Sequence, residues 1–383
     1  MSQGQAPRIW LVLGDKRGDN GQVEVIADAL ARQRGWQSER RHLEMRPKYV
    51  FGKPRVGPTL YHLDLERSDA LEPPWPDLIL TCGRRPANAA LWIKKQSGGR
   101  SRIVLVGKPS GWMAHFDLII TSAETLPAPF PNVLHIGLPL MQLDPSRLQT
   151  GRAEWQGALA PLPRPLVAFL IGGPTNPFVY NSTVVRRFRE RIQQVLASGG
   201  TPYLVSSRRT PRRFMQRLRQ GLPEAVRVYD WNDPQGENPY AGLLALADRF
   251  VVTGDSISMQ VEVARLGKAL EILSLPTGWF GGIDHARRSL AARLFQPPRD
   301  DSPRENFRIR TARALYHLRL LQQTRHFPRF HQMLVDQRLA CWADTGGQDE
   351  PATGAGSPEG ADARTAQDLQ HILERIDRLT PVS

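Results

Sequence analysis

Cysteine is scarce in this chain, and with it the patterns that cysteines usually form. The 383 residues include two cysteines, Cys82 and Cys341, which lie far apart in the sequence. Such a pair supplies neither a disulfide framework nor the closely spaced ligands of a structural zinc site. The scarcity predicts a protein of a reducing compartment, and we expect the cytoplasm.

Long apolar runs are also missing. The first apolar run, RIWLVLG at residues 8–14, is too short for the core of a signal peptide and leads directly into a turn. No later run approaches the ~18 apolar residues that a membrane-spanning helix needs. We therefore expect a soluble protein, for which any membrane contact is peripheral, at the inner face.

Negative charge is in deficit, because 37 acidic residues stand against 51 lysines and arginines, a formal net charge of +14. This balance favours anionic partners such as phosphates or acidic lipid head groups. The excess is partly local, since ten arginines and one acid, Glu190, lie between Arg186 and Arg219. Two interpretations stay open for that segment, solvated helix faces or contact with an anionic membrane. No recognisable nucleic-acid motif is present, and no nucleic-acid partner is expected.

The sequence does contain a repeated alternation of short apolar runs and amphipathic stretches. The strand pattern begins at residues 8–13, returns at 77–82 and 102–107, and restarts after a proline-rich break at 166–171. Such alternation is typical of parallel strands joined by crossover helices. We therefore predict an α/β fold with two Rossmann-like domains facing a cleft, followed by C-terminal helices.

Composition and periodicity divide the chain into six predicted segments. The segments are an N-terminal Rossmann-like, acceptor-side domain (1–145), a linker (146–165), a nucleotide-binding C-terminal Rossmann-like domain (166–305), C-terminal helices (306–344), a disordered stretch rich in glycine, proline and serine (345–365), and a short helical tail (366–383).

The loop GDKRGDNGQ at residues 14–22 is the first candidate site, because ligands of open α/β sheets bind beyond the carboxyl ends of strands. It lacks both the GxGxxG pattern of dinucleotide sites and the GK[ST] ending of a P-loop. Its density of charge exceeds what a plain strand-to-helix turn needs, although such a turn is the alternative. Asp19 is the candidate catalytic base, because a carboxylate at the loop tip can deprotonate an acceptor hydroxyl.

Two loops of the second domain are candidates for holding phosphate. Gly172, Gly173 and Thr175 follow the strand at 166–171 and could bind phosphate through backbone N–H groups. Ser207, Arg208 and Arg209 follow the apolar run PYLV and could add a hydroxyl and two guanidinium groups. A simple turn and a basic surface turn are the respective alternatives.

A third loop, TGDSISMQVE at residues 253–262, combines helix-capping groups with an acid one turn later. Asp255 or Ser256 can cap the helix, and Ser256 and Ser258 place hydroxyls in its first turn, where the helix dipole favours anions. Glu262 shares a helix face with Ser258 and could accept hydrogen bonds from a ribose diol. The alternative is an ordinary capped helix with a solvated glutamate. No metal cluster and no cofactor are predicted.

Several of these motifs together resemble the elongated-mitochondria fission factor family, which contains a plant mitochondrial fission factor and many bacterial relatives. They are LGDKRGDNGQ, PDLILTCGRR, IGGPT, SSRRTP, NPYAGLLALAD and VVTGDSISM, within residues 8–295. The resemblance implies a fold similar to that of GT-B glycosyltransferases, which need no bound metal. Glu262 then matches a donor-ribose ligand and the loop at 172–175 a diphosphate loop, whereas Gln22 stands where a related transferase has histidine.

Two functions follow from this resemblance and the candidate residues. The first is a GT-B-type glycosyltransferase with a nucleotide-diphosphate sugar as donor and an envelope glycan or lipid-linked saccharide as acceptor. The second is a non-catalytic adaptor that recruits a membrane-remodelling, dynamin-like partner. The polar loops favour ligand binding, because an adaptor does not require them.

Overall fold

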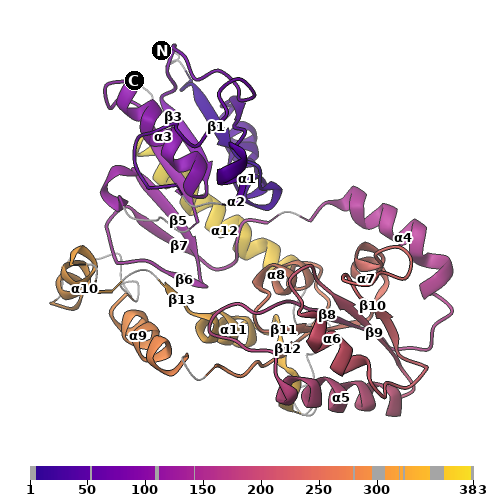
Figure 1. The fold of residues 1–383 in the computed structure, drawn as a ribbon. Helices are drawn as coiled ribbons and strands as arrows, with labels where there is room; N and C mark the ends of the chain where they lie inside the picture. Colours follow the sequence, from indigo (N-terminus) through magenta and orange to yellow (C-terminus); the bar gives the residue numbers. More distant parts are fainter. Residues whose placement is uncertain are drawn as a thin grey trace. The chain divides into compact units, whose positions relative to one another are not determined.

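The chain folds into two compact α/β units in a computed structural model, which describes residues 6–51, 54–107, 112–141, 143–278, 281–295, 307–318, 320–321, 324–345 and 358–380. The first unit comprises residues 1–142, 289–326 and 364–383, and the second comprises 143–288 and 327–363. Each unit contains one six-stranded sheet (Figure 1).

The sheet of the first unit is parallel throughout, in the order β2-β1-β3-β4-β5-β7. Its strands are β1 (Ile9–Leu13), β2 (Ser38–His42), β3 (Leu78–Cys82), β4 (Arg102–Val106), β5 (Leu118–Ser122) and β7 (Val133–Ile136). The helices are α1 (Arg17–Arg34), α2 (Pro47–Phe51), α3 (Arg84–Gln96), η1 (Met113–His115), α10 (Phe307–His317) and most of α12 (Pro358–Asp377). A short antiparallel pair joins β6 (Thr125–Leu126) to β13 (Thr324–Arg325).

Alternate side chains along these strands enter two different apolar cores. Trp10 and Val12 of β1 pack in the core that contains α3. The alternate residues Ile9, Leu11 and Leu13 pack in the other core, with α1 and α12. Ile372, Leu373 and Ile376 of α12 are fully buried there. Burial of both sheet faces explains why β1, β3 and β5 are continuous apolar runs, whereas the edge strand β2, SERRH, is polar and partly exposed.

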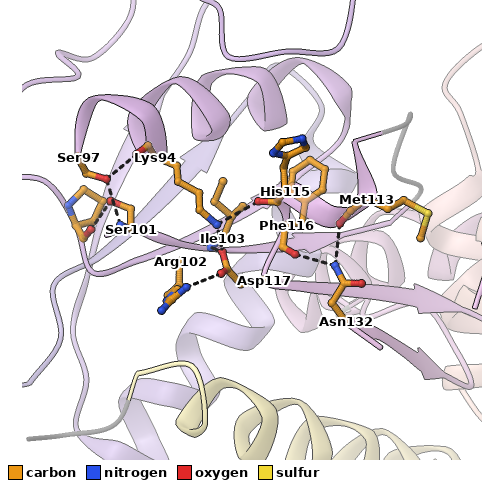
Figure 2. A network of polar contacts seen from close by, with 11 residues as sticks. Lys94, Ser97, Ser101, Arg102, Ile103, Met113, His115, Phe116, Asp117 and Asn132 are labelled. Carbon is orange, nitrogen blue, oxygen red and sulfur yellow. Dashed lines mark hydrogen bonds and ion pairs between the residues drawn. The ribbon is translucent and has the colours of Figure 1, made fainter. Parts of the chain in front are cut away.

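A polar network fixes the amino ends of β4 and β5 (Figure 2). The Asp117 carboxylate, just before β5, accepts hydrogen bonds from Lys94 Nζ (2.6 Å), Arg102 Nη1 (3.1 Å) and the Ile103 backbone N–H (2.8 Å). Nearby, Asn132 Nδ2 donates to two backbone carbonyls of the segment that leads into β5. Because ligands of such sheets bind at the opposite, carboxyl edge, this network has a structural role.

The sheet of the second unit is also parallel, in the order β10-β9-β8-β11-β12-β14. Its strands are β8 (Leu166–Ile171), β9 (Thr201–Ser206), β10 (Arg227–Tyr229), β11 (Arg249–Thr253), β12 (Ala269–Leu273) and β14 (Cys341–Trp342). The helices are α4 (Pro145–Leu159), α5 (Ser182–Ala197), α6 (Arg212–Arg219), α7 (Tyr240–Leu246), α8 (Ile257–Arg265) and α11 (Phe327–Asp336), with η2 (Ala343–Thr345) after β14 and α9 (Gly281–Leu294) across the unit boundary.

The predicted α/β class, with parallel strands in two Rossmann-like units and helices near the C-terminus, is confirmed by these two sheets. The predicted cleft between the domains stays a prediction. The segment 146–165, which is expected to be a linker, contains most of α4, and its role as a linker stays a prediction. Asp144 caps this helix by accepting from the backbone N–H groups of Ser146 and Arg147, and Pro145 occupies the first helical position.

The segments expected after residue 305 divide between the two units. Helix α10 belongs to the first unit, whereas α11 and β14 belong to the second. Of the stretch expected to be disordered, residues 346–357 lie outside the described part of the chain, and 358–365 are helical. The expected tail at 366–383 forms the rest of α12 up to Asp377, and it supplies core residues to the first unit.

Candidate functional site

Both sheets contain a point at which the strand order reverses. In the second unit β8 has β9 on one side and β11 on the other, and in the first unit β1 lies between β2 and β3. Ligands of open parallel sheets bind beyond the carboxyl ends of the strands at such switch points. The loops after β8 and β11, and those after β1 and β3, are therefore the candidate sites (Figure 1).

The glycine loop after β8 is held by hydrogen bonds from within the second unit. The backbone N–H of Gly172 donates to Thr253 Oγ1 (2.9 Å), and that of Gly173 donates to Asp255 Oδ2 (2.9 Å). Both N–H groups are therefore already satisfied. If this loop binds phosphate, the two glycines contribute close approach of the backbone rather than hydrogen-bond donors.

The absence of side chains at these two positions is required by packing. A Cβ at Gly172 would stand 2.6 Å from Asp255 Oδ2, and one at Gly173 would stand 2.3 Å from the backbone oxygen of Arg209. Such distances leave no room for a methyl group. The glycines therefore let the loops after β8, β9 and β11 pack directly against one another.

Asp255 lies inside this packing and not on the surface. The residue is 4% exposed, and its Oδ1 accepts a hydrogen bond from the Tyr180 hydroxyl at 2.7 Å. Burial raises the pKa of the Asp255 carboxyl, while the Tyr180, Thr253 and Gly173 hydrogen bonds lower it. Sequence reasoning placed Asp255 among the ligand-binding groups, and the structure gives it the role of holding the glycine loop in place.

The loop after β9 brings hydroxyl and guanidinium groups to the same edge. Ser207 Oγ donates to the Gly172 carbonyl oxygen at 3.1 Å, and Thr210 Oγ1 bonds to the same oxygen. Arg209 Nη1 donates to Thr175 Oγ1 at 2.9 Å, which links the loops after β8 and β9. Arg208 and Arg209 are exposed, so positive charge is available to an anionic ligand at this edge.

Helix α8 presents one serine and buries the other. Ser256 is 2% exposed and its side chain makes no capping hydrogen bond, whereas Ser258 is exposed in the first turn. Glu262 lies one turn beyond Ser258 and is half-buried. Ser258 and Glu262 thus share a helix face as expected, but the buried position of Ser256 gives its hydroxyl no access to a ligand.

Glu262 is positioned by a tyrosine from another helix. Tyr240, the first residue of α7, donates its hydroxyl hydrogen to Glu262 Oε2. The guanidinium of Arg147 lies over the Tyr240 ring, 5.7 Å from its centroid. Burial, the largest effect, together with the Glu262 charge raises the pKa of Tyr240 well above its usual range, so the phenol stays a donor. The Glu262 carboxylate is held at the carboxyl edge of the sheet.

A buried histidine supports the loop after β11. His331 of α11 donates its Nε2 hydrogen to the Gly254 carbonyl oxygen at 2.8 Å. The side chain is 4% exposed, and burial lowers its pKa to about 4. A Cβ at Gly254 would stand 3.1 Å from His331 Cε1. The neutral imidazole therefore fixes the backbone from which α8 starts.

Asp19 lies at the switch point of the first unit, in the first turn of α1. Its Oδ2 would be 3.3 Å from a Cβ at Gly83, so the carboxylate lies against the turn between β3 and α3. Asn20 fixes the loop by bonding both the N–H and the carbonyl oxygen of Gly14, at 3.2 and 2.8 Å. Burial raises the pKa of Asp19, partly opposed by the charge of Lys16. A raised pKa makes a carboxylate a stronger base.

Four residues of these sites were missed by sequence reasoning. Three of them, Tyr180, Tyr240 and His331, act through contacts with residues far away in the sequence, which no local pattern reveals. Trp231 follows β10 and is 44% exposed. The signal in the sequence that could have identified it is a tryptophan directly after a predicted strand, at the edge where ligands bind.

Two absences among the described residues bear on the class of site. No group of three or more histidine, cysteine, aspartate or glutamate side chains gathers there in a way that could hold a metal ion. In the same part of the chain, no helix is both long enough and apolar enough to cross a membrane.

Comparison with solved structures finds similarity spread over nearly the whole chain. MurG from Acinetobacter baumannii is 13% identical, with a TM-score of 0.44 over 97% of this chain and 100% of that chain. The two parallel sheets themselves establish the fold class.

Comparison with known sequences identifies relatives in a plant and in a bacterium. The chain is 27% identical over 238 residues to the mitochondrial fission protein ELM1 of Arabidopsis thaliana, covering 56% of this chain and 54% of that protein. The match thus spans about half the length of the plant relative. It is 26% identical over 315 residues to an uncharacterized protein of Rickettsia prowazekii, covering 72% and 85%. The family described as Mitochondrial fission ELM1 matches residues 17–294, well over half of the sequence, and the chain belongs to that family.

Proposed function

We propose that this protein is a glycosyltransferase that takes a nucleotide-diphosphate sugar as donor and a glycan or lipid-linked saccharide as acceptor. One observation carries the proposal. The switch-point edge of the second unit has exposed guanidinium and hydroxyl groups, and helix α8, which follows β11 at that edge, contains a carboxylate that accepts a hydrogen bond from a tyrosine. Phosphate, hydroxyl and diol groups are what this combination of side chains binds.

The diphosphate is assigned to the groups that are free to meet it. Arg208, Arg209 and Ser258 are exposed at this edge, and the closely packed glycine loop lets a ligand approach the backbone. Thr175 adds a half-buried hydroxyl beside Arg209. Arginine pairs with phosphate oxygens through two parallel hydrogen bonds, which gives both affinity and orientation.

The nucleoside is assigned to Glu262 and Trp231. Glu262 can accept hydrogen bonds from both ribose hydroxyls while Tyr240 holds its other side. Trp231 is anchored through its backbone N–H, which donates to Ser206 Oγ at 2.9 Å, and its exposed ring follows β10 at the same edge. Stacking of a base on such a ring is worth roughly 1–3 kcal/mol.

The reaction step is assigned to Asp19. Its carboxylate would take the proton of the acceptor hydroxyl as that oxygen bonds to the anomeric carbon of the sugar, and the nucleoside diphosphate would leave with the bonding electrons. Burial of Asp19 supports this assignment, because it raises the pKa of the carboxyl and so its basicity.

The competing function is a non-catalytic adaptor that recruits a membrane-remodelling, dynamin-like partner. It rests on the similarity to the plant relative, a mitochondrial fission protein that is aligned over about half its length. The tyrosine-held carboxylate favours the transferase, because an adaptor has no need to orient a polar group in this way.

Calorimetric titration with UDP, GDP and ADP tests the donor site. We expect at least one to bind the wild type, and Glu262→Ala to weaken that binding by about 1–3 kcal/mol, the range for losing a hydrogen bond to a charged group. Glu154→Ala, an exposed acid of α4, is the matched control and should bind like the wild type. Absence of nucleotide binding at millimolar concentration would leave the adaptor function in its place.

A transfer assay tests the base. Asp19→Asn should bind nucleotide like the wild type and lose transfer activity by about 10²–10⁴-fold, the usual contribution of a general base. Asp28→Asn, an exposed acid of the same helix, should leave the rate unchanged. Equal activity in Asp19→Asn and the wild type would remove Asp19 from the reaction.

A further inference from the structure

The structure separates the arginines of the basic segment 186–219 into two groups. Three of those on α5 and α6 are paired within the second unit. Arg191 forms a bidentate ion pair with Glu271 at 2.6 Å, Arg187 Nη1 donates to the Ser274 carbonyl oxygen at 2.7 Å, and Arg219 lies 3.5 Å from Asp233. The Arg191 pair is largely buried and stabilises the fold, whereas the Arg219 pair is exposed and contributes little. All three arginines already have partners within the unit, so an anionic ligand would be bound more readily by other arginines.

The second group includes three arginines that surround a cavity between α5 and α6. The cavity has a volume of about 440 Å³, within the ordinary range of small-molecule sites. Its lining includes Arg186, Arg189 and Glu190 of α5 together with Arg217 at the end of α6. We call this cavity the α5/α6 groove. The lining therefore contains three guanidinium groups and one carboxylate.

Arg189 connects the two helices that form the groove. Its Nη2 donates to the backbone carbonyl oxygens of Arg217 (2.8 Å) and Gln220 (2.6 Å), so that it satisfies carbonyls at the carboxyl end of α6. Its Nε–H is buried and has no hydrogen-bond partner among the described residues. A buried donor without a partner is unfavourable, so this side chain is held in place by its two carbonyl contacts and not by its Nε–H.

Arg186 and Arg217 supply positive charge that is exposed to solvent. Arg217 is exposed and makes no side-chain hydrogen bond or ion pair with another described residue. Arg186 Nε lies 3.6 Å from Glu190 Oε1, but the two side chains are 69% and 59% exposed. An ion pair that is so exposed is weak and easily exchanged for another anion. The groove therefore has an excess of positive charge that its own acid does not neutralise.

We propose that the α5/α6 groove is a binding site for a terminal phosphate or pyrophosphate group. Arg186 and Arg217 would bind the phosphate oxygens, and the Arg189 guanidinium would fix the separation of the two helices. Guanidinium groups suit this ligand because their paired N–H groups match phosphate oxygens. The groove shares no residue with the edge assigned to the nucleotide, so this site stands or falls independently of the transferase proposal. A soluble phosphoester and the head group of a lipid both carry the required chemistry.

The test compares a groove variant with a control of equal charge. The groove variant is Arg186→Gln with Arg217→Gln, and the control is Arg212→Gln with Arg213→Gln, which removes two exposed charges from α6 outside the groove. Inorganic pyrophosphate, followed by calorimetry, probes the soluble source. Cosedimentation with phosphatidylcholine vesicles containing phosphatidic acid probes the lipid source, with pure phosphatidylcholine as the blank.

We expect the groove variant to lose about tenfold or more in affinity, as for the loss of two charge-assisted hydrogen bonds, and the control to lose much less. Loss confined to pyrophosphate identifies a soluble ligand, and loss on vesicles identifies a lipid head group. Equal losses in both variants would mean diffuse charge attraction and would overturn the site. Unchanged binding in the groove variant, or no binding of either probe to the wild type, would also overturn it.

Discussion

Gly172 and Asp255 lie so close together that a Cβ on the glycine would stand 2.6 Å from the carboxylate. The buried carboxylate also accepts the N–H of the next residue, Gly173. Two loops separated by about eighty positions in the chain are thereby locked at one edge of the sheet. The lock has consequences for stability that do not depend on any ligand.

Gly172→Ala should destabilise the second unit by about 1–3 kcal/mol, because overpacking forces backbone shifts in a filled interior. Gly157→Ala is the matched control, since no atom lies within 4 Å of a Cβ at that position in α4. It should be neutral or slightly stabilising, as alanine favours a helix over glycine. Thermal unfolding of both variants measures the difference. Equal melting temperatures would contradict the close packing of Gly172 against Asp255 as a source of stability.

Tyr240→Phe should weaken nucleotide binding by about 1 kcal/mol, roughly fivefold, because Glu262 loses the donor that orients it. This expectation rests on the proposed donor site. Tyr203→Phe removes a half-buried hydroxyl of β9 for which the structure gives no hydrogen bond, and it should bind like the wild type. Calorimetry with the tightest-binding of the three nucleotides measures both variants against the wild type. Equal affinities of Tyr240→Phe and Tyr203→Phe would contradict a role for Tyr240 in orienting Glu262.

His331 should make stability fall in mild acid. Its folded-state pKa is about 4 against an ordinary value of 6.5, so the unfolded chain binds the proton more readily between these values. Its contribution is therefore fully present above pH 6.5 and is lost as the pH falls toward 4, by about 3 kcal/mol in total.

Urea unfolding across that range, for the wild type and His331→Gln, isolates this contribution. The glutamine keeps an N–H donor for Gly254 and does not titrate, so the difference between the two proteins should shrink as the pH falls. His371→Gln, an exposed position of α12, should follow the wild type at every pH. A constant difference between the wild type and His331→Gln would exclude the buried imidazole as the cause.

Leu373→Ala should destabilise the first unit by about 2–5 kcal/mol, the usual result of deleting a fully buried leucine. Gln370→Ala, an exposed position of the same helix, should change stability little. Hydrogen exchange can assign the effect, since protection should drop in β1 and β3, whose side chains share the core with α12. Unchanged protection there would show that α12 is dispensable for that core.

The sequence was sufficient for the central strands of both sheets, because strands buried on both faces consist of apolar runs such as residues 166–171. It missed the edge strand β2, because the residues of that strand, SERRH, are polar and partly exposed. It was insufficient for α4, since prolines on both sides concealed a helix start that Asp144 and Pro145 mark in the ordinary way. The two-residue strand β14 is defined by pairing with β12 and not by its own pattern.

The candidate sites divide in the same way. Strand ends followed by glycine and polar residues were enough to select the loops of Asp19, Gly172 and Glu262. The orientation of side chains within them depends on distant partners. Asp255 turns inward to Tyr180, and Ser256 is buried while Ser258 is not. Local capping rules treat these neighbours alike, so burial could not be read from them.

The first unit is discontinuous, and this has a consequence for how the protein is made. Its sheet is encoded before residue 137, but helix α12, which fills one of its two cores, is encoded after the whole stretch 143–288 of the second unit. During synthesis this apolar face of the first sheet therefore lacks α12 while residues 143–288 of the second unit are made. The domain that emerges first from the ribosome is the one that is completed last.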